Sequence, residues 1–174
     1  MTDNVHQGHR ARKRFGQNFL HDPHVIGRIV KAIAPKPTDV LVEIGPGLGM
    51  TASHGSKAFG RLSVMTQYYC QAIPVVEVGP GAFKPAPKVD SAVVRLLPYP
   101  IAERAKVDPA VLNRVCLEAF NQRRKTLRNG FSNFATAEQI SALGIDPTIR
   151  PEQLPVSGFV KVAQWLAAQE NQDV

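Results

Sequence analysis

A strand that runs directly into a glycine-rich turn is the feature that most constrains the fold of this chain. Residues 40–44 read VLVEI, a short continuous apolar run of the kind found in buried parallel strands. Gly45, Gly47 and Gly49 follow at once, and residues without a Cβ allow a sharp turn and a close approach of a ligand to the backbone. A GxGxG turn after a buried strand indicates a Rossmann-like cofactor site, and an ordinary tight turn is the alternative.

A cofactor site of this kind also needs an acidic residue about twenty positions further on, where its carboxylate accepts hydrogen bonds from ribose hydroxyls. No Asp or Glu occurs between Glu43 and Glu77. Residues 53–56, SHGS, read as a loop in place of the helix that should follow the turn. Further strand–helix units do not fit before Phe59. The sequence therefore predicts that the α/β part is interrupted, with a junction near residues 49–55.

Helical patterns lie on both sides of this junction. Asp22 is suited to cap a helix that has Pro23 at its first position, and the prolines at 35 and 37 should end that helix. The segment FGRLSVMTQYYCQ predicts a second helix. The residues expected on its apolar face are Leu62, Met65 and Tyr69.

Strand patterns follow, and helical patterns replace them after a composition break. Residues 72–78 and 90–97 predict two strands that pair as an antiparallel hairpin. A long helix should then run from Asp108–Pro109 to about Arg128. Two further helices are expected after it, one with a capping box at Thr136 to Gln139 and a stop at Gly144, and one that begins at Ser157. The predicted domains are an α/β part at residues 1–99 and a small all-α part at residues 100–174.

Composition limits the class of protein. The hydrophobic share of 44% and the charged share of 20% are those of a soluble globular chain, and no apolar run is long enough for a membrane span. The N-terminus has no apolar signal core. Cys70 and Cys116 are isolated thiols without metal-ligand spacing, as expected for a reducing compartment. We therefore expect a cytoplasmic protein that binds no metal.

Positive charge is concentrated in two segments. The chain has a formal net charge of +7, and HRARKR and NQRRKTLRN together hold eight of its 21 Lys and Arg residues. Two basic patches indicate a polyanionic partner such as nucleic acid, and a solvated basic face without a partner is the alternative. We expect the four basic residues of HRARKR to form a flexible arm. In the second segment, we expect the helix that ends near residue 128 to place Arg124, Lys125 and Arg128 on adjacent sides of one turn. The expected nucleic-acid contacts are Arg10, Arg12, Lys13, Arg14, Arg123, Arg124, Lys125 and Arg128.

Five segments in order resemble one family, the S-adenosylmethionine-dependent adenine dimethyltransferases of small-subunit ribosomal RNA. The segments read RKRFGQNFL, VEIGPGLG, GRLSVMTQYYC, FKPAPKVDSAVVRL and EAFNQRRKTLRN. The resemblance implies an α/β fold: a Rossmann-like methyltransferase domain, here truncated, followed by a small all-α domain. It implies N6-dimethylation of two adjacent adenines near the 3′ end of that RNA, by a monomer that binds the small ribosomal subunit. It also implies cofactor contacts at Asn18, Leu20 and Gly45, with Gly47 as a weaker candidate.

The chain departs from the family pattern between the glycine turn and the GRLSVM helix. The family has there a long segment with its ribose-binding acid, the acid that contacts the cofactor's adenine, and an Asn-Leu-Pro-Tyr sequence that positions a flipped target adenine. Residues 96–99, LLPY, lack the asparagine and fall at the end of a predicted strand. We assign no catalytic residue in this chain.

Three interpretations follow from the sequence. The chain is a dimethyltransferase by family, or a non-catalytic RNA- or ribosome-binding protein that needs only the segments present. An oxidoreductase that uses a dinucleotide is the third, and it depends on the glycine turn alone. Because the missing strands would leave apolar edges exposed, we expect a marginal or rearranged α/β part beside a better-formed helical part.

Overall fold

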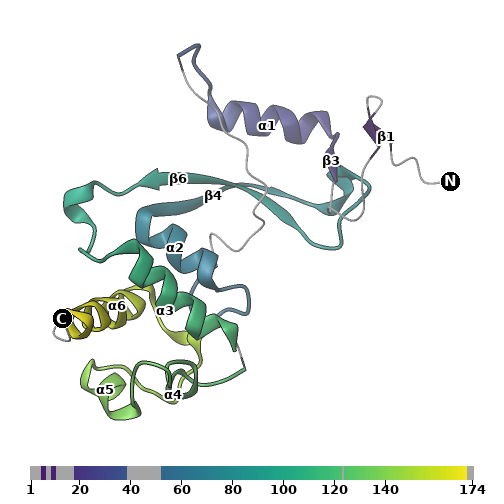
Figure 1. Cartoon of the computed structure of the whole chain (residues 1–174). Helices are drawn as coiled ribbons and strands as arrows, with labels where there is room; N and C mark the ends of the chain where they lie inside the picture. The colour runs from purple at the N-terminus through teal and green to yellow at the C-terminus, as the bar shows by residue number, and fades with distance from the viewer. Residues whose placement is uncertain (1–4, 7–8, 11–17, 39–51, 123, 172–174) are drawn as a thin grey trace. The chain divides into compact units, whose positions relative to one another are not determined.

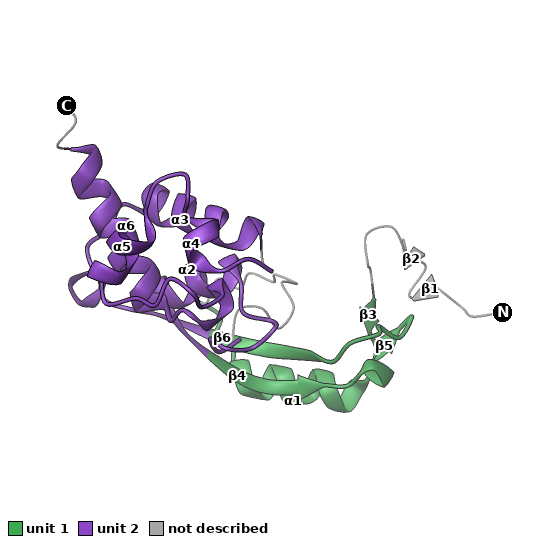
Figure 2. Cartoon of the chain, turned by 90° about the horizontal axis from the view of Figure 1, so that it is seen from below, with its two compact units in different colours: residues 1–47, 73–95 green, residues 48–72, 96–174 purple. Residues whose placement is uncertain are grey.

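A computed structural model describes residues 5–6, 9–10, 18–38, 52–122 and 124–171 (Figure 1). The predicted strand at residues 40–44 and the glycine turn after it lie outside the described residues. Contacts between Cα atoms divide the chain into two compact units (Figure 2). Unit 1 comprises residues 1–47 and 73–95, and unit 2 comprises residues 48–72 and 96–174.

Unit 1 contains a helix and short strand pairs. The helix α1 spans Pro23–Ile33, and the Asp22 carboxylate accepts hydrogen bonds from the backbone N–H groups of His24 and Val25. The predicted cap and first-turn proline are thus confirmed. Ala34 ends the helix in a left-handed conformation and donates its N–H to the Val30 carbonyl. The strand pairs are antiparallel: β1 (Val5–His6) with β2 (His9–Arg10), and β3 (Phe19–Leu20) with β5 (Phe83–Lys84).

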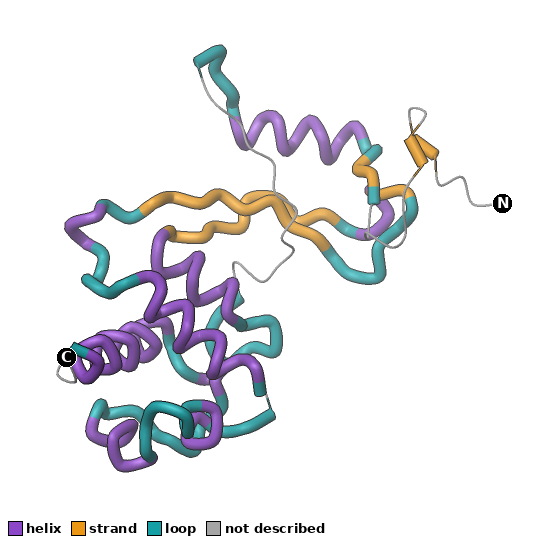
Figure 3. Tube along the Cα trace, viewed as in Figure 1, coloured by secondary structure: helices purple, strands orange, loops and turns teal. Residues whose placement is uncertain are grey.

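The predicted hairpin is present. Strands β4 (Cys70–Val78) and β6 (Ser91–Pro98) form a two-stranded sheet, drawn in orange in Figure 3. The Tyr99 N–H donates to the Tyr69 carbonyl at 2.9 Å, which joins the start of β4 to the end of β6 as an antiparallel pairing requires. A short 3₁₀ turn, Pro80–Ala82, lies in the connection between them.

Unit 1 has a small apolar core. Among the described residues of unit 1, the buried members of its cluster are Val76, Val78 and Ala82, and half-buried residues of α1, β3, β5 and β6 pack against them. No residue of α1 is buried. Three apolar residues at helical spacing on α1 are 41% to 52% exposed: Ile26, Val30 and Ile33. The expectation of a marginal α/β part stays a prediction, because the apolar run at residues 40–44 lies outside the described residues.

Unit 2 is a helical assembly with a much larger core. Its α-helices are α2 (Arg61–Tyr69), α3 (Pro109–Asn121), α4 (Leu127–Gly130), α5 (Ala137–Ala142) and α6 (Val156–Glu170). Its 3₁₀ turns are Ile101–Glu103 and Pro151–Gln153. The α5 capping box is formed as predicted, since Thr136 and Gln139 exchange side-chain-to-backbone hydrogen bonds. Gly144 ends this segment with φ +73°.

The helices α3 and α6 pack against each other at the centre of unit 2. They bury Leu112, Val115, Cys116 and Ala119 from α3 and Phe159, Val162, Ala163 and Leu166 from α6. The rings of Phe120 and Phe159 stack with centroids 5.5 Å apart, and the ring of Phe59 meets Phe120 edge-on. The contacts join helices that are distant in sequence, so this core holds unit 2 together.

The predicted apolar face of α2 is wrong at Leu62, whereas Met65 and Tyr69 are half-buried and Met65 packs against the helical core. Leu62 is 45% exposed, whereas Ser63 and Val64 are fully buried against the helical core. Ser63 is tolerated there because its hydroxyl accepts the Gly60 N–H at 3.0 Å and so is not left unsatisfied. Apolar residues occur on several sides of this short helix, and its packing partner therefore decides which side is buried.

The compact units do not follow the predicted boundary between residues 99 and 100. Because α2 packs against α3 and α6, residues 48–72 belong with the helical unit. The division into a domain at 1–99 and a domain at 100–174 stays a prediction. Within the described residues, no helix has the length and apolar character needed to cross a membrane.

A matched pair of leucines on α3 tests the core. Leu112 is fully buried and Leu117 is 45% exposed on the same helix. We expect Leu112→Ala to lower the free energy of unfolding by about 2–5 kcal/mol, because the side chain's transfer energy is forfeited and a cavity remains. Leu117→Ala should change it by less than about 0.5 kcal/mol. Urea denaturation followed by circular dichroism measures both, and equal effects would contradict this assignment of the core.

The two thiols should differ in reactivity. Burial raises the pKa of the Cys116 thiol from 9.0 to about 12, against a smaller opposing effect of the Arg61 charge. Folding therefore favours the neutral thiol. The stability this contributes is fully present below pH 9 and is lost as the pH rises toward 12.

At pH 8 a thiol-specific reagent should label Cys70, which is half-buried, in the native protein. Cys116 should react only after denaturation, because the thiolate is the nucleophile. The variant Cys70→Ser isolates the second thiol. Rapid labelling of that variant under native conditions would show that Cys116 is not protected.

Candidate nucleic-acid interface

The second basic segment forms a turn and a short helix. The helix α3 ends at Asn121, and Gln122 leaves the helical conformation with φ −122° and ψ 62°. The Lys125 N–H donates to the Gln122 carbonyl at 2.8 Å and closes a turn. The helix predicted to continue to about Arg128 is therefore wrong.

Tertiary contacts explain this break. The Leu127 side chain is fully buried, and its backbone N–H donates to the Ile149 carbonyl at 2.8 Å. The next N–H, of Arg128, donates to the Pro147 carbonyl at 2.9 Å. A continuous helix would satisfy these N–H groups within itself, so the bonds to residues 147 and 149 replace it. Main-chain hydrogen bonds and one buried leucine thus fix the position of α4.

Three predicted nucleic-acid contacts are exposed on this segment. Arg124 and Lys125 lie in the turn, and Arg128 lies on α4, so they do not share one helical turn as predicted. The one ion pair among the described residues joins Arg114 to Glu170. In that part of the chain no carboxylate pairs with the three cations, which leaves their charge available to a phosphate backbone. Arg123 lies outside the described residues.

The first basic segment is only partly described. Arg10 lies in β2, which pairs with β1, so the backbone there is a short strand, and the flexible arm stays a prediction. Arg12, Lys13 and Arg14 lie outside the described residues.

The expected cofactor contacts are also only partly described. Leu20 pairs with Phe83 in the β3–β5 ladder, and its side chain packs against the apolar cluster of unit 1. Asn18 is half-buried immediately before β3. Gly45 and Gly47 lie outside the described residues. The described residues thus place two of the four predicted contacts on one short segment and assemble no complete cofactor site.

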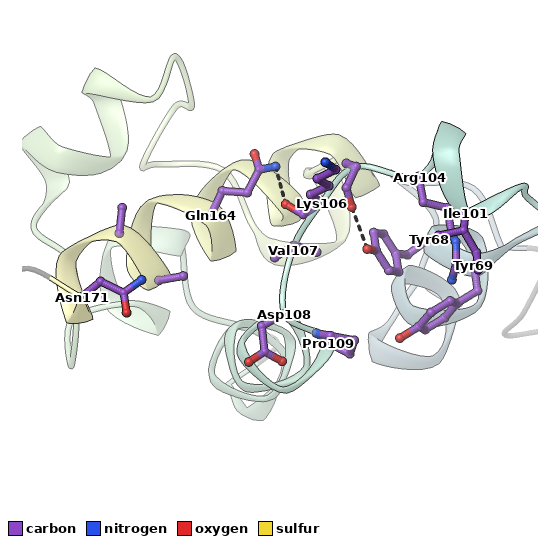
Figure 4. Close-up of a pocket in the computed structure, with 13 residues that line it drawn as sticks. Tyr68, Tyr69, Ile101, Arg104, Lys106, Val107, Asp108, Pro109, Gln164 and Asn171 are labelled. Carbon is purple, nitrogen blue, oxygen red and sulfur yellow. Dashed lines mark hydrogen bonds between the residues drawn. The ribbon is translucent and has the colours of Figure 1, made fainter.

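Unit 2 contains a cavity that the sequence analysis did not find. It has a volume of about 830 Å³ and is lined by the end of α2, the start of α3, the end of α6 and the loop before α3 (Figure 4). Two aromatic rings and two cations line it: Tyr68, Tyr69, Arg104 and Lys106. The signal available in the sequence is the ERAK segment beside the composition break, but its spacing from the two tyrosines gives no reason to join them.

Hydrogen bonds hold the cavity wall in place. The Tyr68 hydroxyl donates to the Ala105 carbonyl at 2.7 Å, and the Gln164 side-chain amide donates to the Lys106 carbonyl at 2.9 Å. The Arg104 guanidinium lies 5.3 Å from the centroid of the Tyr69 ring. No cluster of three or more His, Cys, Asp or Glu side chains suited to a metal ion occurs in the described ranges.

Comparison with known proteins gives the relatives of this chain. The family model for ribosomal RNA adenine dimethylase matches residues 8–54 and 50–168. The ribosomal RNA small subunit methyltransferase A of Pseudoalteromonas translucida (strain TAC 125) is 41% identical over 263 positions, which span 95% of this chain and 98% of the relative. The protein of the same name from Aeromonas hydrophila is 40% identical, with spans of 98% and 99%.

The same alignment shows how much shorter this chain is. The alignment with the Pseudoalteromonas protein has 263 positions and this chain has 174 residues, so at least 89 positions (263 less 174) have no counterpart here. The two matched stretches of the family model meet at residues 50–54.

Among solved structures, a dimethyladenosine transferase from Plasmodium falciparum has a similar fold. It has a TM-score of 0.52 and 22% sequence identity, and the similarity covers 72% of this chain and 53% of that chain. The fold class is the predicted one, a Rossmann-like methyltransferase part followed by a helical part. This chain belongs to the ribosomal RNA adenine dimethylase family.

Proposed function

We propose that this chain binds small-subunit ribosomal RNA and does not itself transfer methyl groups. The observation that carries the proposal is the set of exposed cations Arg124, Lys125 and Arg128, which main-chain hydrogen bonds hold on a well-packed helical unit. The net charge of +7 adds a long-range attraction to a polyanion. The curated relatives are named as methyltransferases of small-subunit ribosomal RNA, which supports this RNA as the partner.

The proposal of inactivity depends on what the shortened sequence contains. Methyl transfer to adenine N6 requires the target base to be held in line with the methyl donor. The sequence contains no Asn-Leu-Pro-Tyr and no acid between Glu43 and Glu77. In the similar LLPY sequence the first three residues end β6, and the Tyr99 N–H donates to the carbonyl of Tyr69, the residue before β4. In this proposal these residues stabilise the hairpin and do not bind a base.

S-adenosylmethionine is the cofactor of this family, and an active methyltransferase is the second candidate function. The family match and the preserved VEIGPGLG segment favour it. We propose Asn18, Leu20, Gly45 and Gly47 as the contacts that remain for this cofactor. The packing of Leu20 against the unit 1 cluster leaves a partial site, so we expect weak cofactor binding. We further propose that the chain acts as a monomer in the cytoplasm, where its ribosomal partner is assembled.

Methyl transfer is tested on small subunits from a strain that lacks the family's methylation. With labelled S-adenosylmethionine, this chain should incorporate no label above background, and the Pseudoalteromonas relative serves as the positive control. Co-sedimentation should still show binding of the chain to the subunit. Incorporation above background would establish the second candidate function.

Charge removal on the basic segment tests the RNA contact. The variant Arg124→Gln/Lys125→Gln/Arg128→Gln should bind the subunit more weakly and reduce the slope of log K against log salt by about 0.7–0.9 for each phosphate that the variant no longer neutralises. A control with the same charge change, Arg28→Gln/Lys31→Gln/Lys161→Gln, removes exposed cations elsewhere. Equally weakened binding in the two variants would mean that net charge, and not this segment, determines binding.

A further inference from the structure

We propose that the cavity of unit 2 is a second RNA site, which takes one unpaired nucleotide of single-stranded RNA. The inference rests on the proposed RNA-binding function and assigns a ligand to a different part of the molecule. The base of this nucleotide would stack in the aromatic part of the cavity beside Tyr69, and the phosphate of the nucleotide would lie near Lys106. A volume of about 830 Å³ is within the range of small-molecule sites and accommodates a nucleotide.

The aromatic part of the cavity consists of two tyrosines and a guanidinium. The rings of Tyr68 and Tyr69 meet edge to face with centroids 4.8 Å apart, and Arg104 lies over the Tyr69 ring. Figure 4 shows Arg104 and both tyrosines on the same side of the cavity. Aromatic rings and planar guanidinium groups are the surfaces on which proteins stack unpaired bases.

Two cations and one carboxylate line the cavity. The Arg104 Nε is buried and makes no hydrogen bond, and it is the one cationic atom among the buried unpaired polar atoms of the described residues. Lys106 is exposed, and the described part of the chain offers it no ion-pair partner. The Asp108 carboxylate, which accepts the Ala110 N–H as the cap of α3, also lines the cavity and offsets one of the two positive charges. An anionic ligand is therefore favoured over a cationic one.

The wall is formed before any ligand binds. The Tyr68–Ala105 and Gln164–Lys106 hydrogen bonds tie the loop before α3 to α2 and α6 (Figure 4). The Tyr99 N–H holds the backbone at Tyr69. Binding to such a site does not require ordering of the loop, which reduces the entropic cost of association.

The test uses the full chain and two labelled RNA probes, hexaadenylate and an abasic hexamer with the same phosphates. Fluorescence anisotropy measures the dissociation constants. We expect Tyr69→Leu to weaken hexaadenylate binding by about five- to 150-fold, the range of one stacked base, and to leave abasic binding unchanged. Lys106→Gln, at an exposed position, should weaken both probes. Tyr99→Leu is the matched control, since Tyr99 is partly exposed and does not line the cavity.

Circular dichroism of each variant establishes that it is folded. Equally weakened binding of both probes by Tyr69→Leu, or equal effects of Tyr69→Leu and Tyr99→Leu, would overturn the site. The hexamer measurement does not involve the ribosomal subunit. The result expected for the triple charge variant and the results expected for the cavity variants can therefore be contradicted independently. A negative result for the cavity thus leaves the proposed function standing, and the reverse also holds.

Discussion

The packing of α3 against α6 is the constraint on which the rest of the described structure depends. The stacked rings of Phe120 and Phe159 and the buried aliphatic residues around them form a core to which α2 and α4 attach. Both candidate RNA surfaces are built on this core. The basic segment follows the end of α3, and the cavity lies between the start of α3 and the end of α6. Loss of the helix pair would remove both surfaces together.

Within the described residues, the two units differ in how many apolar side chains they bury. The family model matches this chain in two stretches that overlap at residues 50–54, shortly after the apolar run predicted to begin a Rossmann-like sheet. Unit 1 keeps α1 and a hairpin but has only three buried core residues among those described. The helical unit lies almost entirely after residues 50–54, and its described residues form the larger of the two clusters.

Signals between residues close in sequence predict the structure correctly. The Asp22 cap, the Thr136–Gln139 capping box and the pairing of β4 with β6 each depend on near neighbours or on strand pattern. The end of α3 is not predictable in this way, because the bonds that replace the helix go to residues 147 and 149, which no local pattern identifies. The cavity escapes prediction for the same reason, since its tyrosines and cations come from separate elements and meet only in the folded unit.

The anchoring of α4 has a consequence for how this surface tolerates sequence change. The N–H groups of Leu127 and Arg128 hold the segment, and any residue other than proline supplies the same donor. The backbone geometry of this segment therefore depends little on which side chains stand at positions 124, 125 and 128. Substitutions there can alter the positive charge of this surface in small steps without a loss of folding, so the charge can drift in evolution while the scaffold stays constant.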